Sequence, residues 1–344
     1  MDGTQGVVSF LGLSQPRPRD LQEYAHRRLL ARHWRSRHLP SSASTESQDH
    51  RGRGMNDEQM TEAVRAWVAR ENEAERGPIY PLDRGLVGSR ARRMETADSD
   101  FDIRTIYRRD PQDYVSAFKI NKITKSMVEG NIDVSGWDLP TFMYLLWSSD
   151  PNAIEYVFAQ DPNKISNFYN GLHRIATEVF NPQRAFMGYR GLAIKYNHAL
   201  REYFRGFDQI GIVRKCEMRE NDMARLLKQA ATGLHAAYTA LYIRYTLRPP
   251  IVNYFDLSMA CKNYSVIPEL TLHNLVLTRS LADAYAIEDV IRTSLSKYDT
   301  ICREVDAVAS ELVVHGHDEA RQQANAKIVD RFVFEHIFGD SHGK

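Results

Sequence analysis

Residues 88 to 103 read Gly88-Ser-Arg-Ala-Arg-Arg-Met-Glu-Thr-Ala-Asp-Ser-Asp-Phe-Asp-Ile103, and this stretch predicts both the fold and the chemistry of the chain. Asp100 and Asp102 lie two residues apart on an expected strand, so both carboxylates leave the same face of a sheet. Phe101 and Ile103 leave the opposite face, where they can be buried. Two carboxylates that point together repel each other unless a cation neutralises them, and hard oxygen ligands at this spacing suit Mg²⁺.

The beginning of the same stretch suits a triphosphate. Gly88 and Ser89 follow a short apolar segment, and a glycine lets the backbone approach a phosphate closely while the serine can donate a hydrogen bond. Arg90 offers a planar fork for a phosphate or a nearby carboxylate. A Gly-Ser pair alone is usually a turn, and a lone Asp-x-Asp is usually a solvated edge. Together, eleven residues apart from Ser89 to Asp100, they favour a nucleotide and metal site.

A two-metal site usually needs a third carboxylate from another strand. The segment Asn131-Ile-Asp-Val134 has the required apolar-acid-apolar alternation, so Asp133 is the preferred third ligand. Glu129 and Asp138 are the competing assignments, although Asp138 suits the N-cap of a following helix better. Ser135-Gly136 is expected to form a turn between the two.

The pattern of apolar residues predicts an α+β chain, with a small mixed β-sheet core followed by an all-helical domain. An amphipathic helix is expected from Met55 to about Glu75, and short strands are expected around 86–87, 101–107 and 132–134. From Leu139 onward the pattern is helical. The expected parts are a disordered, Arg- and Ser-rich tail over residues 1–54, a core over 55–138 and a helical domain over 139–338.

The longest helical stripe runs from Leu226 to Tyr245 with a 3.6-residue period and stops at Pro249-Pro250. Further stripes are expected over residues 270–312 and 320–338. Arg248 follows the long stripe, where a helix C-terminus favours a cation in any case.

The tail contains nine Arg, five acids and no Lys, a composition that cannot bury enough apolar surface to offset the entropy of ordering. An arginine-rich arm for nucleic acid and a transit-like segment are its functional interpretations. The non-functional interpretation is a disordered tail, or upstream sequence attached by a wrong start site ahead of Met55.

Bulk composition adds little about partners. The chain has 344 residues with 45 Lys and Arg against 44 acids, so net charge gives no indication of nucleic acid. No run of about 18 apolar residues predicts a membrane span, and no secretory signal is recognisable. Cys216, Cys261 and Cys302 form no framework, which favours idle thiols in a reducing, cytoplasmic setting. His315-Gly-His-Asp318 lacks a second pair of ligands and is read as a loop.

The motifs resemble those of the DNA polymerase β nucleotidyltransferase superfamily, and in particular its predicted RNA-repair-pathway branch. The similarity is carried by Gly88-Ser-Arg-Ala91, Asp98-Ser-Asp-Phe-Asp-Ile-Arg-Thr-Ile-Tyr107 and Gly136-Trp-Asp-Leu139. It covers roughly residues 80–310. Where the family commonly has Gly after the first motif, this chain has Arg93, which could crowd the loop or add phosphate contacts.

The resemblance implies an enzyme that transfers a nucleoside monophosphate from an NTP to a hydroxyl and releases pyrophosphate. Two Mg²⁺ ions, with Mn²⁺ as an alternative, are expected on Asp100, Asp102 and Asp133. Nucleotide contacts are expected from Gly88, Ser89, Arg90 and Lys195, the last of which is equally well explained as a solvated helix lysine. The acceptor is RNA or a protein hydroxyl, and a degenerate, regulatory nucleotide- or RNA-binding protein is the rival from another class.

Overall fold

The computed structural model describes residues 55–73, 78–115, 126–159, 166–210, 220–263, 300, 303 and 319–339. All of them belong to one of the two units of the chain, Arg53–Lys344. The expected tail, the loop at 315–318 and all but two residues of the stripe at 270–312 lie outside the described residues.

A four-stranded mixed sheet forms the β part of the chain. Its strands are β1 (Ile79–Leu86), β2 (Phe101–Arg109), β3 (Met127–Glu129) and β4 (Ile132–Asp138), in the order β1-β2-β4-β3. The central pair, β2 and β4, is parallel, and β1 and β3 add to its two edges in antiparallel orientation. The expected small mixed sheet in an α+β chain is therefore confirmed.

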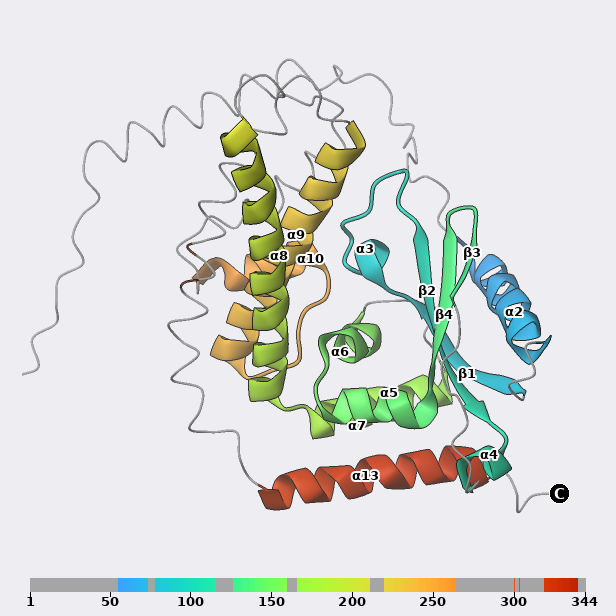
Figure 1. The fold of residues 1–344 in the computed structure, drawn as a ribbon. Coiled ribbons are helices and arrows are strands. Elements are labelled where there is room, and N and C mark those ends of the chain that lie inside the picture. The colour runs from blue at the N-terminus through green and yellow to red at the C-terminus, as the bar shows by residue number, and fades with distance from the viewer. Residues whose placement is uncertain are drawn as a thin grey trace, which may run out of the picture. The chain divides into compact units, whose positions relative to one another are not determined.

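Helix α2 (Asp57–Glu73) packs on one face of this sheet (Figure 1). Trp67 is fully buried and meets the ring of Tyr107 edge to face, with ring centroids 5.9 Å apart. Met60 and Val64 complete the same stripe, at the i, i+4, i+7 spacing of a helix face. The amphipathic helix expected from the sequence is confirmed.

The other face of the sheet has an apolar end, which helices cover, and an acidic end. Towards the C-terminal ends of β2 and β4, Ile106 and Trp137 pack against Phe142 and Tyr156 of the following helices. Because side chains alternate along a strand, this is also the face onto which Asp102 and Asp133 project, nearer the N-terminal ends. Helices thus cover one end of the face, and the acids lie at the other.

The remaining elements are helical. They are α3 (Gly88–Ala91), α4 (Pro111–Val115), α5 (Leu139–Trp147), α6 (Pro151–Phe158), α7 (Asn167–Val179), α8 (Pro182–Ile210), α9 (Glu220–Thr246), α10 (Tyr254–Ala260), the 3₁₀ turn η2 (Cys261–Asn263) and α13 (Glu319–Phe338). Helices α8 and α9 lie side by side around a shared apolar core (Figure 1). The stripe expected over Leu226–Tyr245 is confirmed in α9, and α13 matches the stripe expected over 320–338.

No helix in the described part of the chain could cross a membrane. The division of the chain at residue 138 stays a prediction.

One local expectation between β4 and α5 was wrong. Strand β4 continues through Ser135 and Gly136, where a turn was expected, because Gly136 leaves the room that Trp67 fills on the sheet. Asp138 is the N-cap residue of α5, as expected, although its side chain makes no capping hydrogen bond. Its Oδ1 atom instead accepts a hydrogen bond of 2.6 Å from the hydroxyl of Tyr114.

The contact between Gly136 and α2 predicts an effect on stability. A Cβ atom at Gly136 would lie 2.5 Å from Cη2 of Trp67 and 2.9 Å from Cδ1 of Tyr107, both in buried rings. We expect Gly136→Ala to lower the free energy of unfolding by about 1–3 kcal/mol in urea titrations. Gly191→Ala is the control, because nothing lies within 4 Å of its added methyl and helical Ala is favoured over Gly. Equal stability of Gly136→Ala and the wild type would contradict this packing.

Candidate active site

Two acids lie side by side on the neighbouring parallel strands β2 and β4. Asp102 of β2 pairs in register with Asp133 of β4, so their side chains leave the same face of the sheet at the same level. Asp100 lies just before β2, two residues ahead of Asp102, and is exposed. The structure therefore brings Asp102 and Asp133 together, with Asp100 at the open edge.

The surroundings disfavour negative charge on Asp102. Burial raises the pKa of its carboxyl group, and the charges of Asp133 and Asp100 raise it further, while Lys228 and Arg104 act in the opposite direction. The Oδ1 atom of Asp133 is buried and has no hydrogen-bond partner. A buried carboxylate oxygen without a donor is unfavourable unless a cation or a hydrogen-bonding ligand reaches it.

Arg104 is the cation that the fold itself places beside these acids. It follows Asp102 by two residues and so projects from the same face, where it donates a hydrogen bond to the hydroxyl of Ser135 and lies over the ring of Trp137. Burial lowers the pKa of its guanidinium, and the charges of Asp133 and Asp102 oppose that effect. Arg104 therefore neutralises part of the acidic charge, a role that the sequence interpretation missed although its i+2 spacing pointed to this face.

The Gly88 turn lies directly against Asp102. Gly88 has a φ of 69°, and a Cβ atom there would lie 2.2 Å from Oδ2 of Asp102. Both the left-handed backbone and the close approach require glycine. Ser89 follows at the start of α3 and is buried. The two ends of the decisive sequence stretch thus meet in space.

Arg90 holds the loop between α3 and β2. Its Nη2 donates to the carbonyl oxygen of Ser99 at 2.6 Å and its Nε to that of Asp100 at 3.1 Å. Its guanidinium lies 3.5 Å from the centre of the Phe101 ring. These contacts position the residues that precede Asp102. A direct contact between Arg90 and a phosphate stays a prediction.

Arg93 occupies a backbone conformation that glycine adopts more readily. Its φ is 59°, in the left-handed region, and its side chain is exposed. For a residue with a side chain this conformation costs about 1–2 kcal/mol. The departure from Gly at this position is therefore accommodated by backbone strain, with the side chain in solvent.

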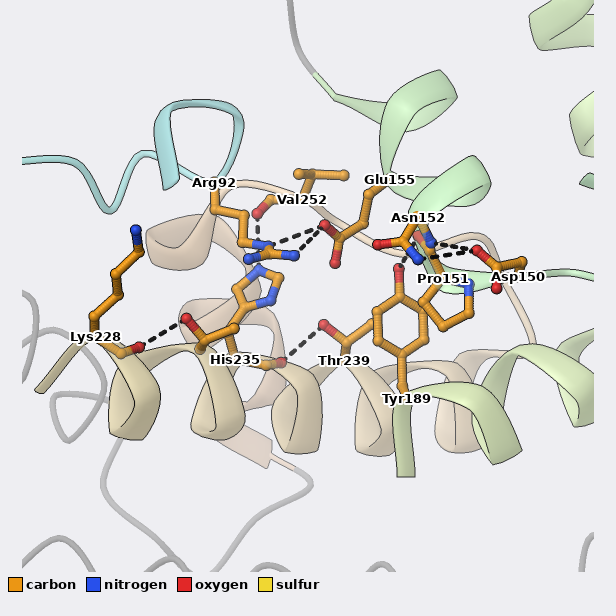
Figure 2. A network of polar contacts seen from close by, with 11 residues as sticks. Arg92, Asp150, Pro151, Asn152, Glu155, Tyr189, Lys228, His235, Thr239 and Val252 are labelled. Carbon is orange, nitrogen blue, oxygen red and sulfur yellow. Dashed lines mark hydrogen bonds and ion pairs between the residues drawn. The ribbon is translucent and has the colours of Figure 1, made fainter. Parts of the chain in front are cut away.

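A buried ion pair fixes the same loop to the helices. Nη2 and Nε of Arg92 donate to Oε2 of Glu155 on α6, at 2.6 and 2.9 Å (Figure 2). Burial acts to lower the pKa of Arg92, but the charge and hydrogen bonds of Glu155 outweigh it, and the pKa is raised. The carbonyl oxygen of Arg92 accepts from the backbone N–H of Tyr254, and Met94 is buried in the core of α8 and α9. Contacts with α6, with Tyr254 and with the core of α8 and α9 thus anchor the loop.

His235 of α9 is buried close to this ion pair (Figure 2). Its Nε2 lies 2.9 Å from the carbonyl oxygen of Val252, to which a neutral imidazole can donate. Burial lowers the pKa of His235 to about 4, and the charge of Arg92 contributes to the lowering. His235 is therefore neutral at physiological pH.

Lys228 is the helical lysine whose charge acts on the acids. It lowers the pKa of Asp102 and lies two turns before His235 on α9, on the side that meets the loop of Arg92 (Figure 2). Lys195, the lysine expected to contact the nucleotide, is exposed on α8, and that contact stays a prediction. Nothing in the sequence around Lys228 distinguishes it from other helical lysines, because its place depends on how α9 packs.

The acids of the site include two that suit a divalent metal. No group of three or more His, Cys, Asp or Glu side chains within the described ranges is arranged to hold a metal ion. The pair Asp102 and Asp133 nevertheless has the oxygen chemistry that Mg²⁺ prefers, including the unpartnered buried oxygen of Asp133. The pair fits a metal, and the set of three acids stays a prediction.

Cys261 shows no sign of nucleophilic chemistry. It is buried, its Sγ donates to the carbonyl oxygen of Tyr238, and burial raises the pKa of the thiol to about 12. A thiol in this state is largely un-ionised at neutral pH. Cys216 and Cys302 lie outside the described residues.

Comparisons with known proteins found a matching family and a similar protein. The sequence model of the family described as RlaP, RNA repair pathway DNA polymerase beta family, matches residues 62–246, more than half of the chain. The protein named "Uncharacterized protein YcgL" of Bacillus subtilis (strain 168) is 27% identical over 121 residues. That match covers 35% of this chain and 45% of the relative, so the chain spans less than half of that protein's length.

The buried state of His235 predicts a pH-dependent stability. Because its pKa is lowered in the folded protein to about 4 from 6.5, its stabilising contribution is complete above pH 6.5 and is lost as pH falls towards 4. We expect the free energy of unfolding to fall by up to about 1.4 kcal/mol per pH unit over this window.

Urea titrations between pH 4.5 and 7.5 measure this dependence. His235→Gln should reduce the slope by about one proton, whereas His198→Gln, at an exposed position on α8, should leave it unchanged. An unchanged slope in His235→Gln would show that this histidine is not the group that titrates.

Proposed function

Because this chain belongs to the RNA repair pathway DNA polymerase beta family, we propose that it is a nucleotidyltransferase that transfers a nucleoside monophosphate from an NTP to a hydroxyl of RNA. The observation that carries the proposal is the pairing of Asp102 with Asp133 directly beside the Gly88 turn. Carboxylates and a close-approaching backbone are the two components that triphosphate chemistry needs. RNA as the acceptor is supported by the description of the family.

We assign Asp102 and Asp133 as metal ligands, with Asp100 as the third acid. When bound, Mg²⁺ or Mn²⁺ supplies charge neutralisation for the acids and for the phosphates of the substrate. The raised pKa of Asp102 supports this assignment, because a cation offsets the burial and the like charges that oppose its ionisation. Arg104 supplies part of the balancing charge from the protein.

The triphosphate is assigned to the Gly88 turn. The carboxylate of Asp102 fills the space that a side chain at Gly88 would take, so a triphosphate bound along this turn would lie beside the acid. Ser89 can donate a hydrogen bond to a phosphate. Lys228 and Lys195 are both exposed, but only the charge of Lys228 acts on Asp102, so we assign Lys228 of α9 to the phosphate tail.

Asp133 is assigned to the proton of the acceptor hydroxyl. Its carboxylate has two oxygens, so one can bind the metal while the other accepts a hydrogen bond or a proton. In the proposed step the acceptor oxygen forms a bond to the α-phosphorus as the bond from that phosphorus to the bridging β-phosphate oxygen breaks. Pyrophosphate leaves, and the proton passes to Asp133. Catalysis comes mainly from positioning and charge neutralisation.

Pyrophosphate release tests the proposal. We expect the wild type to release pyrophosphate from at least one NTP in the presence of Mg²⁺ and single-stranded RNA. Asp102→Asn and Asp133→Asn should each lower the rate by about a thousandfold or more, since the loss of a metal ligand removes several kcal/mol of charge stabilisation.

Asp98→Asn is the matched control, because Asp98 is an exposed acid of the same loop and should be dispensable. Digestion of the product of labelled NTP with nuclease or protease then identifies the acceptor. Equal rates in the wild type and Asp102→Asn would remove the enzyme hypothesis and favour a regulatory binding protein. Label that survives nuclease but not protease would replace RNA with a protein acceptor.

A further inference from the structure

A basic cavity lies among the helices, on elements that carry none of the acids assigned above. It measures about 590 Å³, a size typical of sites for nucleotides and similar ligands. Its lining comes from α5, α7, the start of α8, the segment after α9 and the first turns of α13. The lining residues that matter for its chemistry are Trp147, Arg184, Arg248, Arg321 and Gln322.

The charge of this cavity comes from its arginines. Three arginines line it, and none of its lining residues is an Asp or Glu. The helix termini around it contribute little: α8 and α13 begin there, and α5, α7 and α9 end there. Each terminus is worth about half a charge, so two positive and three negative ends leave about half a negative charge. The guanidinium groups of Arg184 and Arg248 alone exceed that about fourfold, and the cavity attracts anions.

Side chains hold part of the cavity in place. Arg184 donates to Oε1 of Gln322 at 2.9 Å and lies 4.6 Å from the centre of the Trp147 ring. The indole N–H of Trp147 donates to the backbone carbonyl of Gln322 at 3.4 Å. These contacts attach the first turn of α13 to α5 and α8 and orient the Arg184 fork.

One donor in the lining has no partner. The Nε2 atom of Gln322 is buried and makes no hydrogen bond. A buried amide N–H₂ without an acceptor is costly, and a ligand with acceptor oxygens would satisfy it.

The cavity also has an apolar side. Val179, Phe180, Leu247 and Pro249 line it beside the indole of Trp147. A simple inorganic anion would use only the guanidinium groups. A nucleotide uses both parts, because its phosphate suits the arginine forks and the flat faces of its base suit aromatic and apolar side chains.

We propose that this cavity binds one nucleotide of single-stranded RNA, as a docking site for the acceptor strand away from the acids. The proposal rests on RNA being the acceptor in the proposed function. Arg184 and Arg248 contact the phosphate, Trp147 and the apolar side contact the base, and Gln322 donates to an acceptor on the base or sugar. A single docked nucleotide with phosphate contacts and no complete reading of base edges predicts weak sequence preference.

Binding without catalysis tests the site. Fluorescence anisotropy of a labelled twelve-nucleotide single-stranded RNA is measured in EDTA and without NTP, for the full chain. We expect Arg248→Glu, at an exposed position, to weaken binding at least tenfold. Arg184→Ala should weaken it similarly and lower the slope of log Kd against log salt by about 0.7. Arg331→Ala, an exposed arginine ten residues beyond Arg321 on α13, is the matched control and should bind as the wild type does.

The outcomes separate this site from the proposed reaction. Asp102→Asn should bind the RNA as tightly as the wild type, because it alters only the catalytic acids. Failure of pyrophosphate release with intact, Arg248-dependent RNA binding would remove the enzyme and leave the docking site. Equal RNA binding by wild type and Arg248→Glu, with unchanged circular dichroism in both, would overturn the docking site. A polyglutamate peptide with the same charge as the RNA should compete poorly for the site. If it competes as well as unlabelled RNA does, the docking site is overturned and a protein partner is indicated.

Discussion

The parallel pairing of β2 with β4 is the constraint on which the rest of the site depends. Its register places Asp102 opposite Asp133, and strand alternation sends both to the face that α5 and α6 leave uncovered at one end. A shift of one residue would send one of these acids into the core under α2, where neither charge nor hydrogen bonding could be satisfied. The apolar residues that fix the register, Ile103 and Val134, therefore also fix the charge cluster.

The loop that joins α3 to β2 owes its position to contacts far along the chain. Arg92 pairs with Glu155, 63 residues away, and Met94 is inserted between helices that follow much later. A buried ion pair adds little net stability, because desolvation offsets its Coulomb energy, but the loss of one partner is costly. The pair therefore serves mainly to hold one arrangement of the loop, and with it the distance between the Gly88 turn and the acids. The strained φ of Arg93 is tolerated within that anchored loop.

Much of this structure followed from local patterns. The 3.6-residue period of α9, the stripe of α2 and the alternation from Phe101 to Tyr107 on β2 are each short-range signals, and each element formed where it was expected. The role of the paired acids and of the Gly88 turn in binding stays a prediction from those signals. Contacts between distant residues could not be read in this way. Neither the place of Lys228 nor the ion pair of Arg92 has a local signature.

The wrong expectation at Gly136 also has a physical cause. Gly136 was interpreted as a turn residue because glycine favours turns, whereas here it makes room for the ring of Trp67 from another element. Arg90 shows the same ambiguity: its guanidinium hydrogen bonds to the loop that carries Asp100, and its contact with a phosphate stays a prediction. Both residue types are compatible with two roles, and only tertiary neighbours decide between them.

A crystal structure of the protein with Mn²⁺ and a nonhydrolysable ATP analogue, recorded at the manganese edge, tests the central claim most directly. The claim predicts an anomalous peak in contact with carboxylate oxygens of both Asp102 and Asp133, with the triphosphate along the backbone of Gly88 and Ser89. Manganese bound elsewhere, or a nucleotide remote from these two acids, would contradict it.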